Sequence, residues 1–289
     1  MALSITRQSI EVEELIGTGD LQASVTAEAL VPGAGREAVE PLLTDARYIP
    51  GEITVQDGRV IVSGSVACQA VYRQGDEITL RALEASAPIE EVLDLPGAEP
   101  GMAARQFARV SDAAARYENG HMIFRAGVEV RVSAFRLSPV ELIDSVEGEG
   151  IETEFQDVAS EKLAAEAEAS ALLSARVTLP ASLDARTTLM DWANAVIESS
   201  APDLGGLRVR GTVYAEVLIG TGVPGRPAAV IKYPLPFDQL VEIPDWLTEN
   251  AAAEVSVRRV LANVEQGEPG QDSVLAAAFS VSQSGISTN

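Results

Sequence analysis

The 289-residue sequence contains a single cysteine, Cys68, and a single histidine, His121. One cysteine excludes an intramolecular disulfide and is typical of a protein made in a reducing compartment. Metal sites built from histidine and cysteine clusters are excluded by number, and a catalytic triad would have to use His121. Nothing in the sequence places Cys68 or a particular serine beside this histidine. We therefore expect no catalytic residues, no metal site and no cofactor.

Basic residues and long apolar runs are also scarce. Lys and Arg number 21 against 43 Asp and Glu, giving a net charge of −22, whereas nucleic acids bind to basic surfaces. No run approaches the roughly 18 apolar residues that span a bilayer, and the N-terminus has no basic stretch followed by an apolar one. We expect no nucleic acid, no membrane insertion and no signal peptide. Hydrophobic residues make up 46% of the chain, which is enough for a core.

The sequence contains an internal repeat. Val-Ser-Gly-Ser-Val at 62–66 recurs as Val-Arg-Gly-Thr-Val at 209–213. Three prolines recur at a spacing of 148 residues (180 − 32, 236 − 88 and 244 − 96), pairing Pro32 with Pro180, Pro88 with Pro236 and Pro96 with Pro244. A repeat of this length predicts two copies of one domain. We place a first domain with an N-terminal arm at 1–137, an acidic linker at 138–155, and a second domain with a flexible C-terminal tail at 156–289.

Alternating apolar and polar residues predict strands in both copies. The pattern runs from Leu21 to Val31 and again from Leu163 to Leu179, where it outweighs a composition that favours helix. The pairs Asp57-Gly58 and Asn119-Gly120 predict hairpin turns. Further apolar faces are expected at Val60, Val62, Val66 and Val71, at Val128, Val130 and Val132, at Val209, Val213 and Val217, and at Val274, Ala276 and Ala278. The fold class is all-β, with two tandem β-sandwich-like domains from an internal duplication.

One short helix is predicted in each copy. The apolar residues there fall at i, i+3, i+4 and i+7, which indicates a core-facing helical stripe. They are Val39, Leu42, Leu43 and Ala46 in the first copy, and Leu189, Trp192, Ala193 and Val196 in the second. Two Gly-Thr-Gly segments, at 17–19 and 220–222, look like phosphate loops but lack a Walker lysine. We interpret both as tight turns.

Several apolar and turn-forming motifs follow one another in a recognisable order. IEVEELIG at 10–17 and Val31-Pro32 precede GRVIVSGSV at 58–66, Pro88-Ile89 and LPGAEPGM at 95–102. In order and spacing they resemble the SPOCS domain family of spore-forming Firmicutes, which includes the spore coat morphogenetic protein SipL. The second copy keeps VRGTV and Pro236-Phe237 but has DWLT at 245–248, where the first copy has the Pro-Gly-x-x-Pro-Gly-Met stretch.

The resemblance implies a β-rich structural module of the spore envelope. Such proteins are made in the mother-cell cytoplasm without a signal peptide and are deposited on the spore surface. SipL-like proteins also carry a C-terminal LysM module that contacts the coat ATPase. Recruitment through that module is not expected here, because the sequence shows the SPOCS-like copies without it. The family offers no catalytic residues to transfer to this chain.

Three functions follow from these observations. The first is a non-enzymatic structural protein of the coat, exosporium or appendage that self-associates into an oligomer or polymer, alone or together with other spore coat proteins. Its contacts would be strand addition by the N-terminal arm, with Ile5, Ile10 and Val12 as the self-association residues. The second is a bivalent adaptor for a spore coat or cortex partner. The third is a carbohydrate-active β-sandwich enzyme. Duplicated β-modules without a catalytic set favour the first.

Overall fold

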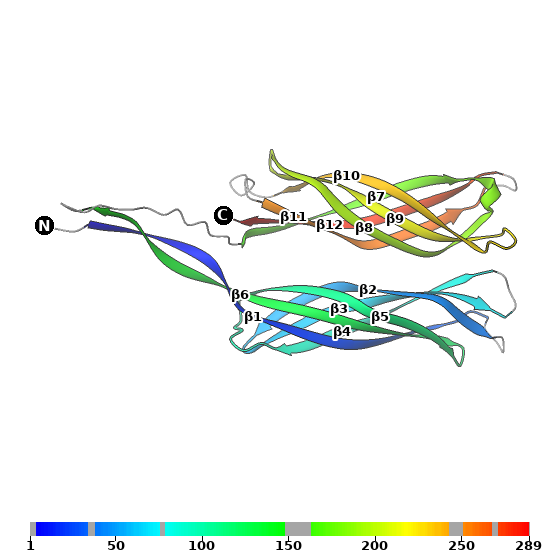
Figure 1. Cartoon of the computed structure of the whole chain (residues 1–289), viewed down its shortest axis with the longest axis horizontal. Helices are drawn as coiled ribbons and strands as arrows, with labels where there is room; N and C mark the ends of the chain where they lie inside the picture. Colours follow the sequence, from blue (N-terminus) through cyan, green and yellow to red (C-terminus); the bar gives the residue numbers. More distant parts are fainter. Residues whose placement is uncertain are drawn as a thin grey trace.

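A computed structural model of the chain describes residues 4–33, 38–75, 79–147, 163–242, 251–267 and 271–288. In these ranges the structure is almost entirely β (Figure 1). The first half forms β1 (Ser4–Leu30), β2 (Val39–Gln56), β3 (Arg59–Gln74), β4 (Arg81–Asp94), β5 (Ala103–Glu118) and β6 (His121–Glu147). The second half forms β7 (Leu163–Leu179), β8 (Ala185–Asp203), β9 (Gly206–Thr221), β10 (Ala228–Glu242), β11 (Ala251–Glu265) and β12 (Ser273–Thr288).

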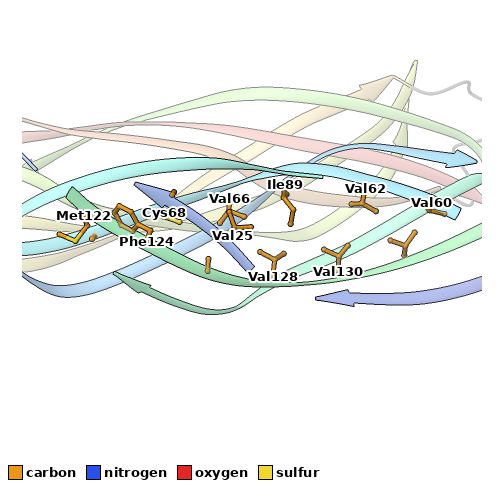
Figure 2. Close-up of a cluster of buried hydrophobic side chains, with 14 of the residues drawn as sticks. Val25, Val60, Val62, Val66, Cys68, Ile89, Met122, Phe124, Val128 and Val130 are labelled. Carbon is orange, nitrogen blue, oxygen red and sulfur yellow. The ribbon is translucent and has the colours of Figure 1, made fainter. Parts of the chain in front are cut away.

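The first six strands build one sandwich, which we call the N-terminal sandwich. One sheet has the order β1-β6-β5 and the other β2-β3-β4, and neighbouring strands are antiparallel. The two sheets face each other, with β2 against β5 and β1 against β4 at their margins. Side chains from both sheets fill the space between them, among them Val25, Val66, Phe124 and Val128 (Figure 2).

The last six strands repeat this topology in what we call the C-terminal sandwich. Its sheets have the orders β11-β12-β7 and β10-β9-β8. Each strand therefore occupies the place of the strand six positions earlier in the chain, with β7 in the place of β1 and β12 in the place of β6. Val209, Val213, Val217 and Leu275 are fully buried in the core of this sandwich. The repeated topology supports the internal duplication, and the all-β sandwich prediction is confirmed.

The period-two patterns determine which side chains enter these cores. Val128, Val130 and Val132 are buried in a row, as the alternation in β6 predicts. Asn119 and Gly120 both have positive φ, as a tight type I′ hairpin requires. One apolar face was predicted one residue out of phase. In β12 it is Leu275 and Ala277 that are buried, not the neighbouring Val274, Ala276 and Ala278.

Both predicted helices are wrong. The stripe from Val39 to Ala46 lies in β2, and the stripe from Leu189 to Val196 lies in β8. The stripes do not face the core either, because Leu42, Leu43 and Val196 are exposed. β-bulges interrupt the period-two alternation in both strands, because each bulge inserts one residue. β2 has register shifts between Pro41 and Leu43 and between Pro50 and Ile53, and β8 has three shifts of the same kind. The described residues contain one short 3-10 turn, Ala181–Leu183.

The two sandwiches contact each other through a small apolar cluster. Val71 from β3 is buried together with Leu189 and Met190 from β8, and Trp192 packs against them. The sequence predicted that Val71 would continue the core face of Val60, Val62 and Val66. It lies on the other face of β3, and its side chain meets the C-terminal sandwich instead.

Truncation of the core aromatic Phe124 should strongly destabilise the N-terminal sandwich. Phe124 has no exposed surface, and Phe→Ala changes in cores cost about 3–5 kcal/mol of unfolding free energy. We expect Phe124→Ala to lower the stability in urea, followed by circular dichroism, by an amount in that range. The matched control is Phe107→Ala in β5, where the ring is 70% exposed, and its effect should stay within about 0.5 kcal/mol. Equal effects would contradict this packing.

Candidate functional site

β1 and β6 continue as a pair beyond the sheet that they share with β5. The first residue of β5, Ala103, pairs with Phe135, so the part of β6 after Phe135 is paired with β1 alone. We call residues 4–14 of β1 and 136–147 of β6 the ribbon. Figure 1 shows it as a twisted two-stranded extension that leaves the end of the N-terminal sandwich. At about 3.3 Å per residue, its eleven β1 residues span about 35 Å.

The ribbon changes the interpretation of the predicted linker. Residues 138–147 are strand and pair with the predicted N-terminal arm, for example Val140 with Ile10 and Leu142 with Gln8. They are therefore not a solvated connector. The acidic residues in this segment suggested a linker, but they alternate with apolar residues that a strand can place on one face. Residues 148–155 lie outside the described residues, and the domain boundaries stay a prediction.

The three predicted self-association residues all lie on the β1 strand of the ribbon. Ile10 and Val12 share one face, because they are two residues apart, and Val140 and Leu142 of β6 extend this face through their pairing. Ile5 lies opposite Val146, and its odd spacing from Ile10 places it on the other face. Its side chain is 43% exposed. The structure thus brings Ile10 and Val12 together and separates Ile5 from them.

The ribbon is a two-stranded element with exposed apolar side chains. Leu137 and Ile143 add to Ile5, and Ile143 is 60% exposed. A two-stranded hairpin alone is only marginally stable in water. Within the described residues, neither outer edge of the ribbon is paired with a further strand. Unpaired backbone donors and acceptors on a strand edge are a template for another strand.

Charged side chains also form ion pairs between the two strands of the ribbon. Arg136 donates to Glu14 at 2.8 Å and Ser138 donates to the same carboxylate at 2.9 Å, and these contacts lower the pKa of Glu14. Arg7 and Glu141 pair at 3.2 Å. Such exposed pairs contribute little stability. The ribbon keeps an acidic excess, with two arginines, Arg7 and Arg136, against Glu11, Glu13, Glu14, Glu141, Asp144 and Glu147.

Glycines allow close packing where the ribbon leaves the sandwich. The LPGAEPGM motif follows β4. Its Gly97 has a φ of +89°, and a β-carbon added at this position would lie only 3.1 Å from Ile16 Cγ2. The motif is held in place by the β2–β3 turn, where the Gly58 amide donates to the Ala98 carbonyl at 2.8 Å. The segment 17–19 was predicted as a tight turn, but it lies inside β1, where Gly17 approaches the Leu95 side chain.

A shallow hollow of about 340 Å³ lies beside the base of the ribbon. Its walls include Pro100 and Met102 from the glycine motif and Phe135 and Leu137 from β6. Two of its lining residues also contact Arg105, whose guanidinium carbon lies 4.6 Å from the centre of the Phe135 ring and whose Nη2 lies 3.0 Å from Glu13 Oε1. The hollow is lined mainly by apolar groups and holds no arrangement of catalytic side chains.

Cys68 and His121, the other candidate side chains from the sequence, lie apart from each other and from the ribbon. Cys68 is buried in the N-terminal core, which raises the pKa of its thiol, as expected for an inert residue. His121 begins β6, and its Nδ1 lies 3.3 Å from the Asn119 carbonyl. In the described ranges, no group of three or more His, Cys, Asp and Glu side chains could hold a metal ion. No helix among those residues is long and apolar enough for a membrane crossing.

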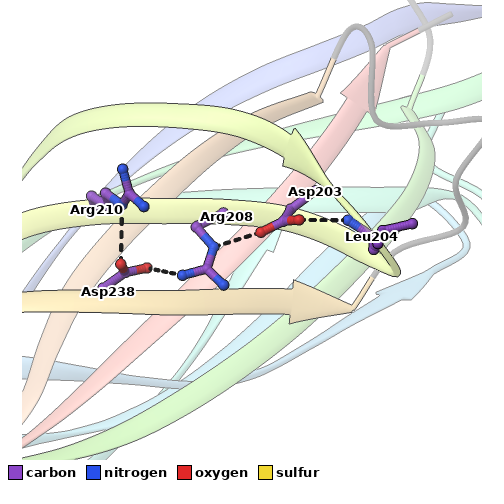
Figure 3. A network of polar contacts seen from close by, with 5 residues as sticks. All are labelled: Asp203, Leu204, Arg208, Arg210 and Asp238. Atoms are coloured by element: carbon purple, nitrogen blue, oxygen red, sulfur yellow. Dashed lines mark hydrogen bonds and ion pairs between the residues drawn. The ribbon is translucent and has the colours of Figure 1, made fainter.

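An exposed charge network lies on the C-terminal sandwich, at the β8–β9 hairpin (Figure 3). Arg208 bridges Asp203 and Asp238 at 2.6 and 3.0 Å, and Arg210 adds a second contact to Asp238 at 3.0 Å. The hydrogen bond from Arg208 lowers the pKa of Asp203, and the Leu204 amide contributes in the same direction. All four charges are paired within the network, which links the hairpin to β10.

The chain forms two β-sandwiches of the same topology, and its most unusual surface is the two-stranded ribbon. Residues 40–118 match the family model described as SipL, SPOCS domain. The match covers β2 to β5 and confirms the resemblance seen in the first copy. No curated protein matches the chain, and no solved structure matches it.

Replacing Gly97 should loosen the base of the ribbon. Gly97→Ala introduces a β-carbon at positive φ, which costs of the order of 1–3 kcal/mol, and also presses it against Ile16. Gly101→Ala is the matched control, because Gly101 has a φ of +91° but nothing within 4 Å of the added carbon. We expect Gly97→Ala to destabilise the N-terminal sandwich by about 1 kcal/mol more than the control. Urea unfolding measures the difference, and amide exchange should show faster exchange in the ribbon for Gly97→Ala only.

Proposed function

We propose that the protein is a non-enzymatic structural protein of the bacterial spore envelope that self-associates through the ribbon. The match to the SipL SPOCS domain supports the link to sporulation. The observation that carries self-association is a two-stranded element with both outer edges unpaired in the described residues and apolar side chains on both faces. In this proposal the protein is made in the mother cell and deposited in the coat, in the exosporium or on an appendage of the spore.

The edge of β1 differs from the edges of two of the four sheets, and it shares its lack of proline with the edge strands β5, β7 and β11. In the sheets β2-β3-β4 and β10-β9-β8, every edge strand contains proline, which lacks the amide donor that a neighbouring strand needs. These prolines are Pro41 and Pro50 in β2, Pro88 in β4, Pro202 in β8, and Pro234 and Pro236 in β10. β1 contains no proline from Ser4 to Leu30. The free edge of β1 can therefore pair with a strand from a second copy along the whole of residues 4–14.

The mechanism is strand addition. Backbone hydrogen bonds along the β1 edge supply cohesion, and the side chains of the added strand extend the apolar face of Ile10, Val12, Val140 and Leu142. Burying apolar area contributes about 25 cal/mol per Å². A contact between unlike surfaces of successive copies would be heterologous, and contacts of that kind build open polymers.

Polar substitution on the ribbon should abolish self-association. The variant Ile5→Thr/Ile10→Thr/Val12→Thr removes apolar contacts and keeps β-branched side chains that suit a strand. We expect it to remain monomeric in sedimentation velocity and to form no filaments or sheets in electron microscopy at concentrations where the unmodified chain assembles. These substitutions are preferable to deleting residues 1–12, because deletion would leave β6 of the ribbon without its partner strand.

The matched control replaces three exposed apolar residues outside the ribbon. Phe107→Thr/Leu172→Thr/Leu204→Thr removes side chains that are 70%, 77% and 92% exposed. This variant should assemble like the unmodified chain. If both triple variants lose assembly equally, general surface hydrophobicity drives it and the ribbon does not. If the ribbon variant still assembles, the proposed contact is wrong.

Self-association should strengthen with salt. The chain carries a net charge of −22 and the ribbon is acidic, so two copies repel each other. Raising NaCl from about 0.01 to 0.15 M shortens the Debye length from about 30 to 8 Å and screens this repulsion. We expect a higher sedimentation coefficient in the higher salt. The alternative adaptor function, with a basic partner on the acidic surface, predicts the opposite trend, because salt weakens attraction between unlike charges.

A further inference from the structure

A second shallow hollow, of about 440 Å³, lies on the outer face of the β1-β6-β5 sheet, and we call it the sheet hollow. Glu129 and Arg131 alternate with the buried valines of β6, so they and their cross-strand neighbours point away from the core. The strand register arranges these side chains in two rows across the three strands. One row is Asp20, Arg131 and Phe107, and the other is Gln22, Glu129 and Arg109.

The two rows form a compact surface. They are two residues apart along the strands, and neighbouring strands lie about 4.8 Å apart, so the six side chains cover about 7 by 10 Å. All six belong to residues outside the ribbon. The sheet hollow is therefore independent of the contact proposed for self-association.

Phe107 is the apolar member of the two rows. Among the aromatic side chains whose surroundings the structure describes, it has the largest exposed fraction, 70%. A ring that stays in water contributes little to folding, because apolar side chains stabilise a fold when they are buried. Phe107 lies opposite Arg131 in the strand register and two residues from Arg109. Its flat face is therefore available to a ligand between charged neighbours.

The four charges of the sheet hollow form two ion pairs. Arg131 donates to Asp20 twice, from Nε to Oδ1 at 2.7 Å and from Nη2 to Oδ2 at 3.3 Å. Arg109 contacts Glu129 Oε2 from Nε at 2.7 Å and from Nη2 at 2.6 Å. The charges of the two pairs cancel, so the sheet hollow is neutral on a chain whose net charge is −22.

The paired groups keep hydrogen-bonding capacity for a ligand. A guanidinium has five N–H donors, and the two contacts of Arg131 to Asp20 use two of them. Both contacts of Arg109 go to Oε2 of Glu129, so the second carboxylate oxygen can accept from a ligand. Gln22 is exposed and supplies an amide that both donates and accepts. Donors and acceptors thus lie side by side near one aromatic ring.

We propose that the sheet hollow binds a neutral saccharide. One face of a sugar ring presents C–H groups with a slight positive charge, which the negative face of an aromatic ring such as Phe107 attracts. Sugar hydroxyls both donate and accept, and this matches the guanidinium, carboxylate and amide groups around the ring. A charged ligand would meet a like charge as close as an opposite one. A wholly apolar partner would strip water from the charged groups.

Saturation-transfer NMR on the full chain tests the site with two neutral probes, cellotriose and tri-N-acetylchitotriose. The first carries hydroxyls alone and the second also carries acetamide groups, so the two responses separate these sources of hydrogen bonding. One stacked ring and a few exposed hydrogen bonds predict a dissociation constant of the order of 1 mM. Binding of either probe supports the proposal. The absence of a response to both at about 10 mM, ten times the expected constant, overturns it.

Substitutions at the ring locate the binding. Phe107→Trp keeps a flat aromatic face and should bind at least as tightly as the unmodified chain. Phe107→Leu keeps apolar area without that face and should weaken binding about tenfold. The matched control, Leu172→Ala, removes an apolar side chain of β7 that is 77% exposed and should leave binding unchanged. Equal binding by Phe107→Leu and the unmodified chain contradicts the proposal. Displacement of the sugar by inorganic phosphate also contradicts it, because the arginines would then form an anion site.

Discussion

The pairing of β1 with β6 is the constraint on which the N-terminal half of the molecule depends. It joins the first and last strands of the sandwich, from Ser4 with Glu147 to Leu30 with His121. This pairing positions Val25 and Phe124 in one core and closes the β1 margin against β4. The same hydrogen-bond ladder continues outward as the ribbon. Core and candidate site are therefore two parts of one continuous strand pair.

Much of the fold follows from local pattern. Alternation in β3, β6 and β9 predicted buried rows such as Val128, Val130 and Val132. The turns at Gly58 and Gly120 were identified from Asp-Gly and Asn-Gly pairs, and both glycines have positive φ. The errors lie where strands are irregular. Bulges in β2 and β8 interrupt the period-two alternation, and the positions of bulges cannot be read from the sequence. The 148-residue repeat was decisive at β7, where composition alone favoured helix.

The candidate site could be predicted only in part. The expectation of strand addition by the N-terminal arm singled out Ile5, Ile10 and Val12. Their partner strand was missed, because its acidic residues were interpreted as a linker. Which segments pair is a long-range property, and Val140 has no local feature that indicates Ile10 as its neighbour. The contact between the sandwiches was missed for a related reason. Val71 continues the valine row of β3 by residue type, yet a sequence does not show that both faces of this strand are covered.

The closure of the N-terminal sandwich by its first and last strands has a consequence for biosynthesis. β1 leaves the ribosome before its partner β6, which is complete only when residue 147 has been made. Until then β1 is an edge without a neighbour, and non-local pairing of this kind is slow to form. An emerging chain therefore offers the same strand surface that the finished ribbon displays. A cell that makes many copies at once must keep these early strands apart until each has met its own β6.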